Sequence, residues 1–418
     1  MADVEIAFRG HAQVKASNPE RIELIAGEAW SQRPAAIGYD VEYDPAALLK
    51  LRGRVRAEVS AGAAGDVFEA TISTRFMRGA PLVLGRDAAP KRELAYQASK
   101  AAADLQRDLV DALRQPDAHG LMRLTPQADA PPPLGSLTLV SMPIGNQADL
   151  SPRALDVLMS VDVILAEDTR AARDALAWRG VRTRMESCYA QNEERRAASL
   201  ADRLRASERI AYVSDAGTPT VSDPGAILVR TAAALGAHVT AVPGASAVVM
   251  ALAVSGLAQG GGFTFQGFPG RAAGARRDFV ARALASPQPT VMFEAPGRAL
   301  GLLELIADAA PGREIAICRD LTKRSEAVLR GKVDTVLEQM SGLEEVRGEY
   351  TIVLAGADAP AGAPAAVRPM ADIEAFMRAL LAAGCPVAPI VSALRAGGAP
   401  RREAYALVSR MAAERAAP

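Results

Sequence analysis

The chain has 418 residues, a length that predicts about two to three domains. Half of the residues are hydrophobic, and 48 basic residues balance 48 acidic ones, which argues against a protein that coats nucleic acid by bulk charge alone. The cysteines, Cys188, Cys318 and Cys385, lie far apart and match no metal-binding spacing, so we expect a reducing cytoplasm, no disulfide framework and no metal site.

No export or membrane segment is expected. The first residues, MADVEIAFRG, include acidic side chains and no apolar run of signal-peptide length. Residues 231–270 contain no Asp, Glu, Lys or Arg and are numerous enough to cross a bilayer. Because Pro243-Gly244, Ser255-Gly256 and Gly260–Gly262 interrupt that stretch, we predict a buried strand, turn and helix there.

Residues 1–125 are expected to form a small α+β domain. Alternating apolar and polar residues predict strands over 6–16, 54–61 and 66–74, and apolar residues at helical spacing predict one helix over 92–115. The sequence PQADAPPPLG, at 126–135, is typical of a stiff linker.

After this linker, strands alternate with helices, which predicts a mostly parallel sheet covered on both faces. A first α/β lobe is expected over 136–260 and a second over 261–356. The strands expected in the two lobes are 136–142, 161–167, 209–214, 238–244, 263–267, 290–295, 314–320 and 349–356. Helices are expected over 151–161, 193–207 and 224–236, with Ser151 as N-cap and Pro152 in the first turn. An Ala/Pro linker at 357–370 would lead to a helical tail at 371–418.

Four turns rich in Gly, Pro and Asp follow the strands of the first lobe. They are MPIGN at 142–146, AEDTR at 166–170, SDAGTP at 214–219 and VPGASA at 242–247. Because ligands of open α/β sheets bind beyond the carboxyl ends of the strands, these turns predict a site at one edge of the sheet. Neither GxGxxG nor GxxxxGK[ST] occurs, so a dinucleotide-binding fingerprint or P-loop is not supported.

In their order and amino-acid sequence, the four turns resemble those of the tetrapyrrole-methylase superfamily. With SDPG, DLTK and the closing RGE, they look like the ribosomal RNA small-subunit methyltransferase I family, over about residues 136–356. That resemblance implies two lobes with S-adenosylmethionine in the cleft between them. It also implies methylation of the ribose 2′-oxygen of a cytidine in 16S rRNA, the 30S ribosomal subunit as partner, no DNA and a homodimer.

The resemblance also implies which residues contact the cofactor. Pro143 and Gly145 would line it from the first loop, and Met292 and Leu321 would cover it from the second lobe. Its remaining contacts would be Asp215, Ala216, Gly217, Ser246 and Ala247. A sulfonium ligand favours nearby carboxylates and few cations, which suits the charge-free stretch 231–270.

Transfer of a methyl group to a hydroxyl requires alignment of the reacting atoms and removal of a proton. Candidate bases are Asp168, Glu193 and Glu294, while Arg170 and Lys323 would hold phosphate or stabilise the alkoxide. Structural alternatives stay open: an ion pair between Asp168 and Arg170, and a helix-terminal carboxylate for Glu193.

RNA would be bound by a local basic segment, GRAAGARRDFVAR at 270–282, with Arg271, Arg276 and Arg277 as the main contacts and Arg282 beside them. A solvated basic helix is the alternative. The tail carries Arg395, Arg401, Arg402 and Arg410.

The chain departs from the family at its histidines. YAQNE, at 189–193, stands where the family usually has His-x-His-Asn-Glu, and APGR at 295–298 replaces a Ser-Pro-His-Arg. The three histidines are His11, His119 and His238, so no histidine is left as base at the predicted site. Two other functions therefore stay open: a small-molecule methyltransferase of the same fold, and a ribosome-binding protein without activity.

The start of the chain, AFRGHAQVKA, looks like domain of unknown function 371. Arg9 and His11 could act there, although a histidine beside a strand is more often structural. A module that docks the substrate or contacts the ribosome is the predicted role.

Overall fold

The computed structural model describes residues 3–26, 33–76, 78, 80–87, 93–127, 133–258, 261–343, 346–357, 377–378, 380–381, 385–396 and 405–411. The chain divides into two compact units. Residues 1–284 and 289–355 form the first, and residues 285–288 and 356–418 form the second. No helix among the described residues is long and apolar enough to span a bilayer.

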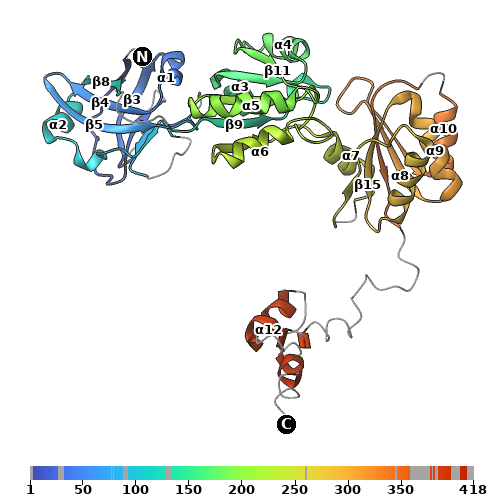
Figure 1. Cartoon of the computed structure of the whole chain (residues 1–418). Coiled ribbons are helices and arrows are strands. Elements are labelled where there is room, and N and C mark those ends of the chain that lie inside the picture. The colour runs from blue at the N-terminus through green and yellow to red at the C-terminus, as the bar shows by residue number, and fades with distance from the viewer. Residues whose placement is uncertain are drawn as a thin grey trace. The chain divides into compact units, whose positions relative to one another are not determined.

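The first part of unit 1 is a closed barrel with the strand order β1-β3-β2-β6-β7-β5-β4-β8 (Figure 1). Its strands are β1 (Val4–Arg9), β2 (Arg21–Ile25), β3 (Ala36–Tyr43), β4 (Arg54–Ala61), β5 (Ala64–Ile72), β6 (Leu82–Gly85), β7 (Ala95–Tyr96) and β8 (His119–Pro126). Short helices α1 (Pro45–Lys50) and α2 (Arg107–Leu113) accompany them. Strict alternation of buried and exposed residues in β1 and β4 directs every second side chain inward.

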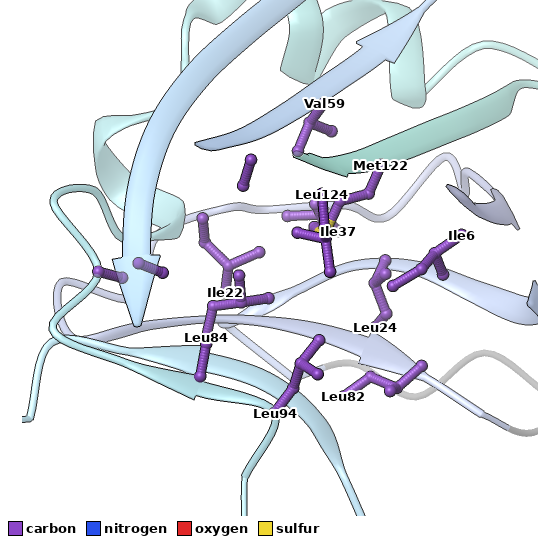
Figure 2. Packing of buried hydrophobic residues seen from close by; sticks show 14 of the residues in the cluster. Ile6, Ile22, Leu24, Ile37, Val59, Leu82, Leu84, Leu94, Met122 and Leu124 are labelled. Carbon is purple, nitrogen blue, oxygen red and sulfur yellow. The ribbon is translucent and has the colours of Figure 1, made fainter. Parts of the chain in front are cut away.

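Aliphatic side chains fill the barrel, as Figure 2 shows for Ile6, Ile22, Leu24 and Met122 among others. Closure also depends on two glycines beside Phe8. A Cβ atom at Gly38 would lie 2.0 Å from the Phe8 ring, and one at Gly120 would lie 2.3 Å from it. The ring therefore occupies space that any other residue at these positions would need.

The single helix predicted over 92–115 is wrong. β7, a 3₁₀ turn at Ala102–Asp104 and α2 lie within that stretch. Gln97 has a φ of 52°, which a right-handed helix cannot accommodate. The apolar residues in the first half of the stretch, Leu94, Ala95 and Ala98 among them, pack into the barrel core.

The first lobe contains a five-stranded sheet with the order β11-β10-β12-β9-β13 (Figure 1). All its strand pairs are parallel, as predicted. The strands are β9 (Ser136–Val140), β10 (Val163–Ala166), β11 (Met185–Ser187), β12 (Arg209–Val213) and β13 (His238–Val242). β10 and β12 are buried throughout and consist largely of Val, Ile, Leu and Ala, which identifies them as central strands. The edge strand β11 was not predicted.

Five helices follow these strands: α3 (Pro152–Ser160), α4 (Thr169–Ala177), α5 (Glu193–Arg205), α6 (Ala226–Ala234) and α7 (Ala247–Ser255). Ser151 Oγ accepts a hydrogen bond from Ala154 N, and Pro152 opens α3, so the predicted cap is confirmed. α7 is apolar on all sides and packs against β15, β16, β17 and β18 of the second lobe.

The second lobe has the strand order β14-β15-β18-β16-β17. Its strands are β14 (Thr264–Phe265), β15 (Thr290–Glu294), β16 (Glu314–Arg319), β17 (Ala327–Lys332) and β18 (Tyr350–Leu354), and its helices are α8 (Ala273–Ala285), α9 (Pro296–Ala309) and α10 (Val333–Ser341). β17 was not predicted, and β15, β16, β17 and β18 pair antiparallel.

The predicted fold class, two α/β lobes with a helical tail, is confirmed.

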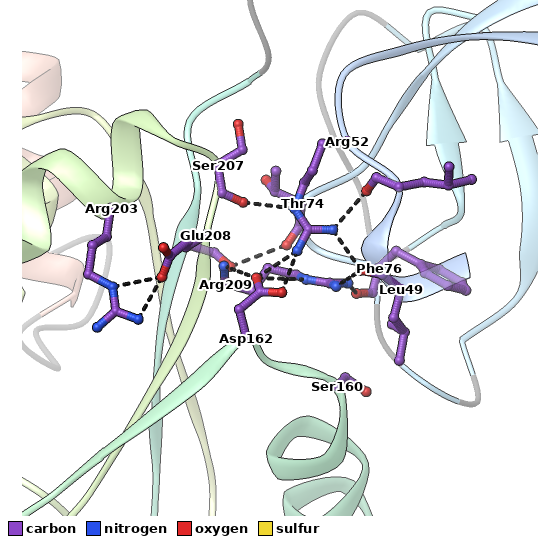
Figure 3. A network of polar contacts seen from close by, with 12 residues as sticks. Leu49, Arg52, Thr74, Phe76, Ser160, Asp162, Arg203, Ser207, Glu208 and Arg209 are labelled. Carbon is purple, nitrogen blue, oxygen red and sulfur yellow. Dashed lines mark hydrogen bonds and ion pairs between the residues drawn. The ribbon is translucent and has the colours of Figure 1, made fainter. Parts of the chain in front are cut away.

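The barrel is joined to the first lobe through a buried network of arginines (Figure 3). Arg52 donates to both carboxylate oxygens of Asp162, at 2.7 and 2.6 Å, and to the carbonyl of Ser207 at 3.0 Å. Arg209, only 4% exposed, donates to the carbonyls of Leu49 and Phe76 in the barrel. Burial, together with the nearby charge of Arg52, lowers the pKa of Arg209 to about 9, so the guanidinium stays charged at neutral pH.

Unit 2 has its own small apolar core, formed by Met377, Leu381, Ile390, Val391, Val408 and Met411. α12 (Val387–Ala396) lies within the predicted helical tail. Arg410 lies in a short helical segment, whereas Arg401 and Arg402, and the side chain of Arg395, lie outside the described part of the chain.

Candidate active site

The loops that follow β9 and β12 are paired to each other. Met142 N donates to the carbonyl of Gly217 at 2.8 Å, and Gly217 N donates to that of Met142 at 3.0 Å. The loop after β13 joins them, because Thr218 Oγ1 lies 2.9 Å from Ser141 Oγ and 3.2 Å from the Ala245 carbonyl. The predicted convergence at the carboxyl edge of the sheet is therefore observed for these three turns.

The turn after β10 is attached to the same group of loops. Asp168 N donates to Asp215 Oδ1 at 3.0 Å. The Asp168 carboxylate in turn accepts from Arg170 N at 2.7 Å and Ala171 N at 3.3 Å, which caps α4. AEDTR thus starts a helix and also orients the carboxylate of Asp215.

The loop from Gly217 to Gly225 has an unusual backbone. Gly217, Thr220, Ser222 and Gly225 have φ values of 71°, 74°, 67° and 120°. Positive φ is costly for a β-branched residue such as Thr220 and for Ser222, so packing on both sides must hold this loop in place.

These loops border a cleft of about 470 Å³ between the two lobes. Apolar cover comes from side chains such as Ile144, Val248, Phe268 and Phe293. Carboxylates line it from both lobes: Glu167, Asp215, Asp223, Glu294 and Glu349. Among the described residues that line this cleft, there is no Lys, Arg or His.

Two of these carboxylates have raised pKa values. Burial raises the pKa of Glu167, and the charges of Asp223 and Asp215 raise it further. Burial likewise raises the pKa of Asp223, with Asp215 adding to the effect and a hydrogen bond from Ser214 opposing it. Three acids therefore share one partly desolvated region, a pattern common where a protein binds a cation or moves a proton. Neither Glu167 nor Asp223 was singled out from the sequence, although AEDTR and SDPG contain them.

The structure brings together five of the nine predicted cofactor residues. Asp215, Ala216, Gly217, Ser246 and Ala247 all line the cleft. Pro143 and Gly145 flank the lining residue Ile144, and Gly145 faces the second lobe, where its Cβ would lie 2.5 Å from Lys323 Cγ. Gly145 therefore permits contact between the lobes.

The two residues predicted to cover the cofactor from the second lobe lie elsewhere. Met292 is fully buried in the core with Phe279 and Leu302, because alternation along β15 directs its side chain to the opposite face from Phe293. Leu321 packs with Ile144 and Val248 behind the cleft lining. Phe268 and Phe293 supply the apolar cover instead.

Glu193 has a structural position. Its side chain is buried, and Oε1 accepts hydrogen bonds from Gly225 N at 2.9 Å and Ile227 N at 2.7 Å. These donors belong to the start of α6, so the carboxylate serves as its cap from a neighbouring helix. This geometry supports the structural alternative for Glu193, which is not among the residues lining the cleft.

The other predicted catalytic side chains also have partners. Glu294 accepts from Arg276 at 2.9 Å and pairs with Arg298 at 2.8 Å. Lys323 lies 2.9 Å from Glu349 and 3.3 Å from Asp320. Burial alone would lower the pKa of Lys323, but its hydrogen bond to Glu349 and contact with Asp320 raise it. Lys323 thus connects Asp320 of the DLTK loop with Glu349 of the RGE segment. Arg170 is exposed at the start of α4.

The predicted RNA contacts separate into two kinds. The Arg276 side chain is only 12% exposed and binds Glu294 and the carbonyl of Arg298, so this arginine is used inside the second lobe. Arg271 and Arg277 are exposed. The predicted three-arginine patch is thereby reduced to two residues on α8 and the loop before it.

Comparison with known proteins agrees with this geometry. Residues 136–337 match the family described as Tetrapyrrole (Corrin/Porphyrin) Methylases. The ribosomal RNA small subunit methyltransferase I of Xylella fastidiosa (strain Temecula1) is 43% identical over 225 residues, which cover 53% of this chain and 82% of that protein. This chain belongs to the ribosomal RNA small subunit methyltransferase I family. The protein of that name from Neisseria meningitidis serogroup B is 40% identical over 53% of this chain and 76% of its own length.

A crystal structure of uroporphyrin-III-C-methyltransferase from Thermus thermophilus aligns with 53% of this chain and 92% of its own, at 23% identity and a TM-score of 0.39. The family members in this comparison match about half of this chain, and the family description matches residues 136–337. The resemblance of residues 1–125 to domain of unknown function 371 stays a prediction.

Proposed function

We propose that this protein transfers the methyl group of S-adenosylmethionine to the ribose 2′-oxygen of a cytidine in 16S rRNA. Membership of the methyltransferase I family supports this function. The observation that carries it is the cleft, whose described lining contains carboxylates and no basic side chain. Such a lining favours a cationic ligand over a phosphorylated one.

The residues present fit a sulfonium cofactor. When bound, S-adenosylmethionine supplies an electrophilic methyl group on a positively charged sulfur. Asp215 is held by Asp168 N and provides negative charge, while Gly217 leaves bare backbone at the cleft wall. Phe268 and Phe293, whose ring centroids are 5.3 Å apart, offer an apolar surface for the remainder of the ligand.

The proton of the 2′-hydroxyl must leave as the oxygen–carbon bond forms and the carbon–sulfur bond breaks. We assign its removal to Glu167, which lines the cleft and has a raised pKa. A base with a pKa nearer to the working pH transfers protons more effectively. Asp168 is the second candidate, although its Oδ1 already caps α4, and Arg170 beside it is proposed to contact phosphate.

The test in cells is a map of 2′-O-methyl groups on 16S rRNA from a strain without this protein. Loss of one methylated cytidine, restored by the intact gene and not by an Asp215→Ala variant, is expected. An unchanged map would contradict the proposed function. Methylation of a small tetrapyrrole by the purified protein, with no transfer to 30S subunits, would favour the alternative substrate.

The 30S subunit is proposed as the physiological substrate, and the cytoplasm as the compartment where it is met. A homodimer is also proposed. Its support is the exposed side of α7, where Val249, Met250 and Val254 are 49%, 40% and 37% exposed. Sedimentation of the purified protein would test the dimer.

A further inference from the structure

The surface of the first lobe around α4 differs from the rest of the chain in its charge. Between residues 170 and 184 there are five arginines and one acid, Asp174, whereas the whole chain has no net charge. Arg170 and Arg173 are exposed on α4 and lie three residues apart, on one face of the helix. Arg182 is exposed in the segment that leads to β11, which packs beside α4.

An exposed tryptophan lies within this basic segment. Trp178, directly after α4, is 61% exposed. The Arg179 guanidinium lies 4.0 Å from the centroid of its ring and is fixed by a 3.0 Å hydrogen bond to the carbonyl of Gln147. The Trp178 ring therefore presents an aromatic face to solvent, and the stacked cation restricts its position.

The surface begins at the cleft. Asp168, the N-cap of α4, donates its backbone N–H to Asp215, which lines the cleft. From there the helix extends to Trp178, a distance of roughly 15 Å at 1.5 Å per residue. A nucleic-acid strand with one nucleotide in the cleft could therefore continue along α4 for two or three nucleotides.

We propose that Arg170, Arg173, Trp178, Arg179 and Arg182, here called the α4 surface, bind single-stranded rRNA next to the target nucleotide. The arginines would contact phosphates, and an unstacked base would lie on the Trp178 ring. This inference rests on the proposed function. It places the RNA on the first lobe, whereas the sequence predicted binding by Arg271, Arg276 and Arg277 of the second.

The test measures binding of the full chain to unmethylated 30S subunits and to a 16S rRNA transcript at several salt concentrations. Trp178→Ala should weaken binding about 10-fold, and Trp178→Phe should retain most of the affinity because it keeps an aromatic face. Arg173→Ala with Arg182→Ala should weaken binding and lower the slope of log affinity against log salt by about 1 to 2.

A charge-matched control is Arg195→Ala with Arg205→Ala on α5, where both side chains are exposed. S-adenosylmethionine binding by calorimetry should be equal in all variants, which shows that each is folded. Equal binding of RNA by the parent and Trp178→Ala, or an equal loss in the α5 control, would overturn the α4 surface. A loss on 30S subunits without any loss on the transcript would instead indicate a ribosomal protein as partner and would also overturn it.

The two proposals fail separately. Absence of methyl transfer to 30S subunits by the parent protein would contradict the proposed function, whatever the variants bind. Normal transfer by the parent together with unchanged binding by the α4 variants would leave the function in place and remove only this inference.

Discussion

The two ends of the parallel sheet in the first lobe differ in how their charged groups are paired, and they have different roles. At the amino ends, Arg209 at the start of β12 and Asp162 before β10 hold the barrel through a buried, hydrogen-bonded network. At the carboxyl ends of the same strands, Asp215 and Glu167 line an open cleft. The charged side chains at the amino ends lie next to groups of opposite charge. At the carboxyl ends, Glu167, Asp215 and Asp223 lie near one another and all are acidic.

This difference shows how the fold separates stability from chemistry. A buried charge is tolerated when it has an opposite charge and hydrogen-bond acceptors nearby, as Arg52 has in Asp162 and as Arg209 has in Asp162 and two barrel carbonyls. Acids that repel one another lower stability, but they are available to bind a cation or accept a proton. Substitutions at the amino ends should therefore change stability most, and substitutions at the carboxyl ends should change binding and methyl transfer most.

The largest loss of stability is expected at the amino ends. Arg209→Ala removes the cation that contacts Leu49 and Phe76, and should lower the free energy of unfolding by about 3 to 5 kcal/mol. Urea unfolding would measure it. Arg205→Ala on α5, whose side chain is 57% exposed, is the matched control and should change stability by less than about 0.5 kcal/mol. Similar losses of unfolding free energy in both variants would mean that the buried network stabilises the protein no more than an exposed arginine does.

The largest loss of binding is expected at the carboxyl ends. Asp215→Ala removes the negative charge held by Asp168 N, and should weaken S-adenosylmethionine binding at least 10-fold while the protein stays folded. Gly217→Val should have a comparable effect, because φ at this position is 71° and a valine side chain would project from the cleft wall. Calorimetric titration would measure the affinity of each variant for S-adenosylmethionine. Parent-like affinity in either variant would mean that the cofactor lies elsewhere.

Methyl transfer should depend on Glu167. Glu167→Gln should lower the single-turnover rate about 10²-fold or more, with little change in cofactor affinity, since only the proton acceptor is replaced. In the parent the rate should stay level across neutral pH and fall on acidification, at a pH above the ordinary glutamate range because the Glu167 pKa is raised. Full activity in Glu167→Gln would transfer the role to Asp168, whose Asn variant should be assayed beside it.

Part of this arrangement could be predicted from sequence because alternation of strands and helices predicts parallel strands, whose carboxyl ends lie at one edge of the sheet. The turns after β9, β12 and β13 were placed correctly at one edge, including Asp215 and Gly217. The role of Glu193 could not be predicted, since its partner α6 begins 33 residues later and only the packing of α5 against α6 brings the two together. Met292 was misplaced because a family motif gives a position in β15 but not the face to which the side chain points. Arg276 was misplaced because its partner Glu294 is distant in sequence and was itself expected to be catalytic.

A smaller effect is expected for Glu193. Glu193→Gln should cost about 1 kcal/mol of stability, since an amide oxygen caps α6 less strongly than a carboxylate does. The methylation rate of the folded variant should equal that of the parent. Measuring both on one preparation separates the two roles, and a rate loss without a stability loss would return Glu193 to the chemistry.

The smallest effect is a gain in stability at the carboxyl ends. Because the pKa of Glu167 is raised in the folded protein, its contribution to stability is fully present below the unfolded-state pKa and is lost as pH rises through the folded value. At neutral pH the ionised group therefore faces Asp215 and Asp223 at a cost, and Glu167→Gln removes that cost. The midpoint of thermal unfolding should rise slightly at pH 7.5, and the difference from the parent should vanish near about pH 4, where glutamate protonates in the unfolded chain. Such a variant would be more stable and less active, as expected when acids are kept close together for function. A gain that persists at pH 4 would have to come from packing, and would remove the evidence that these carboxylates repel one another in the cleft.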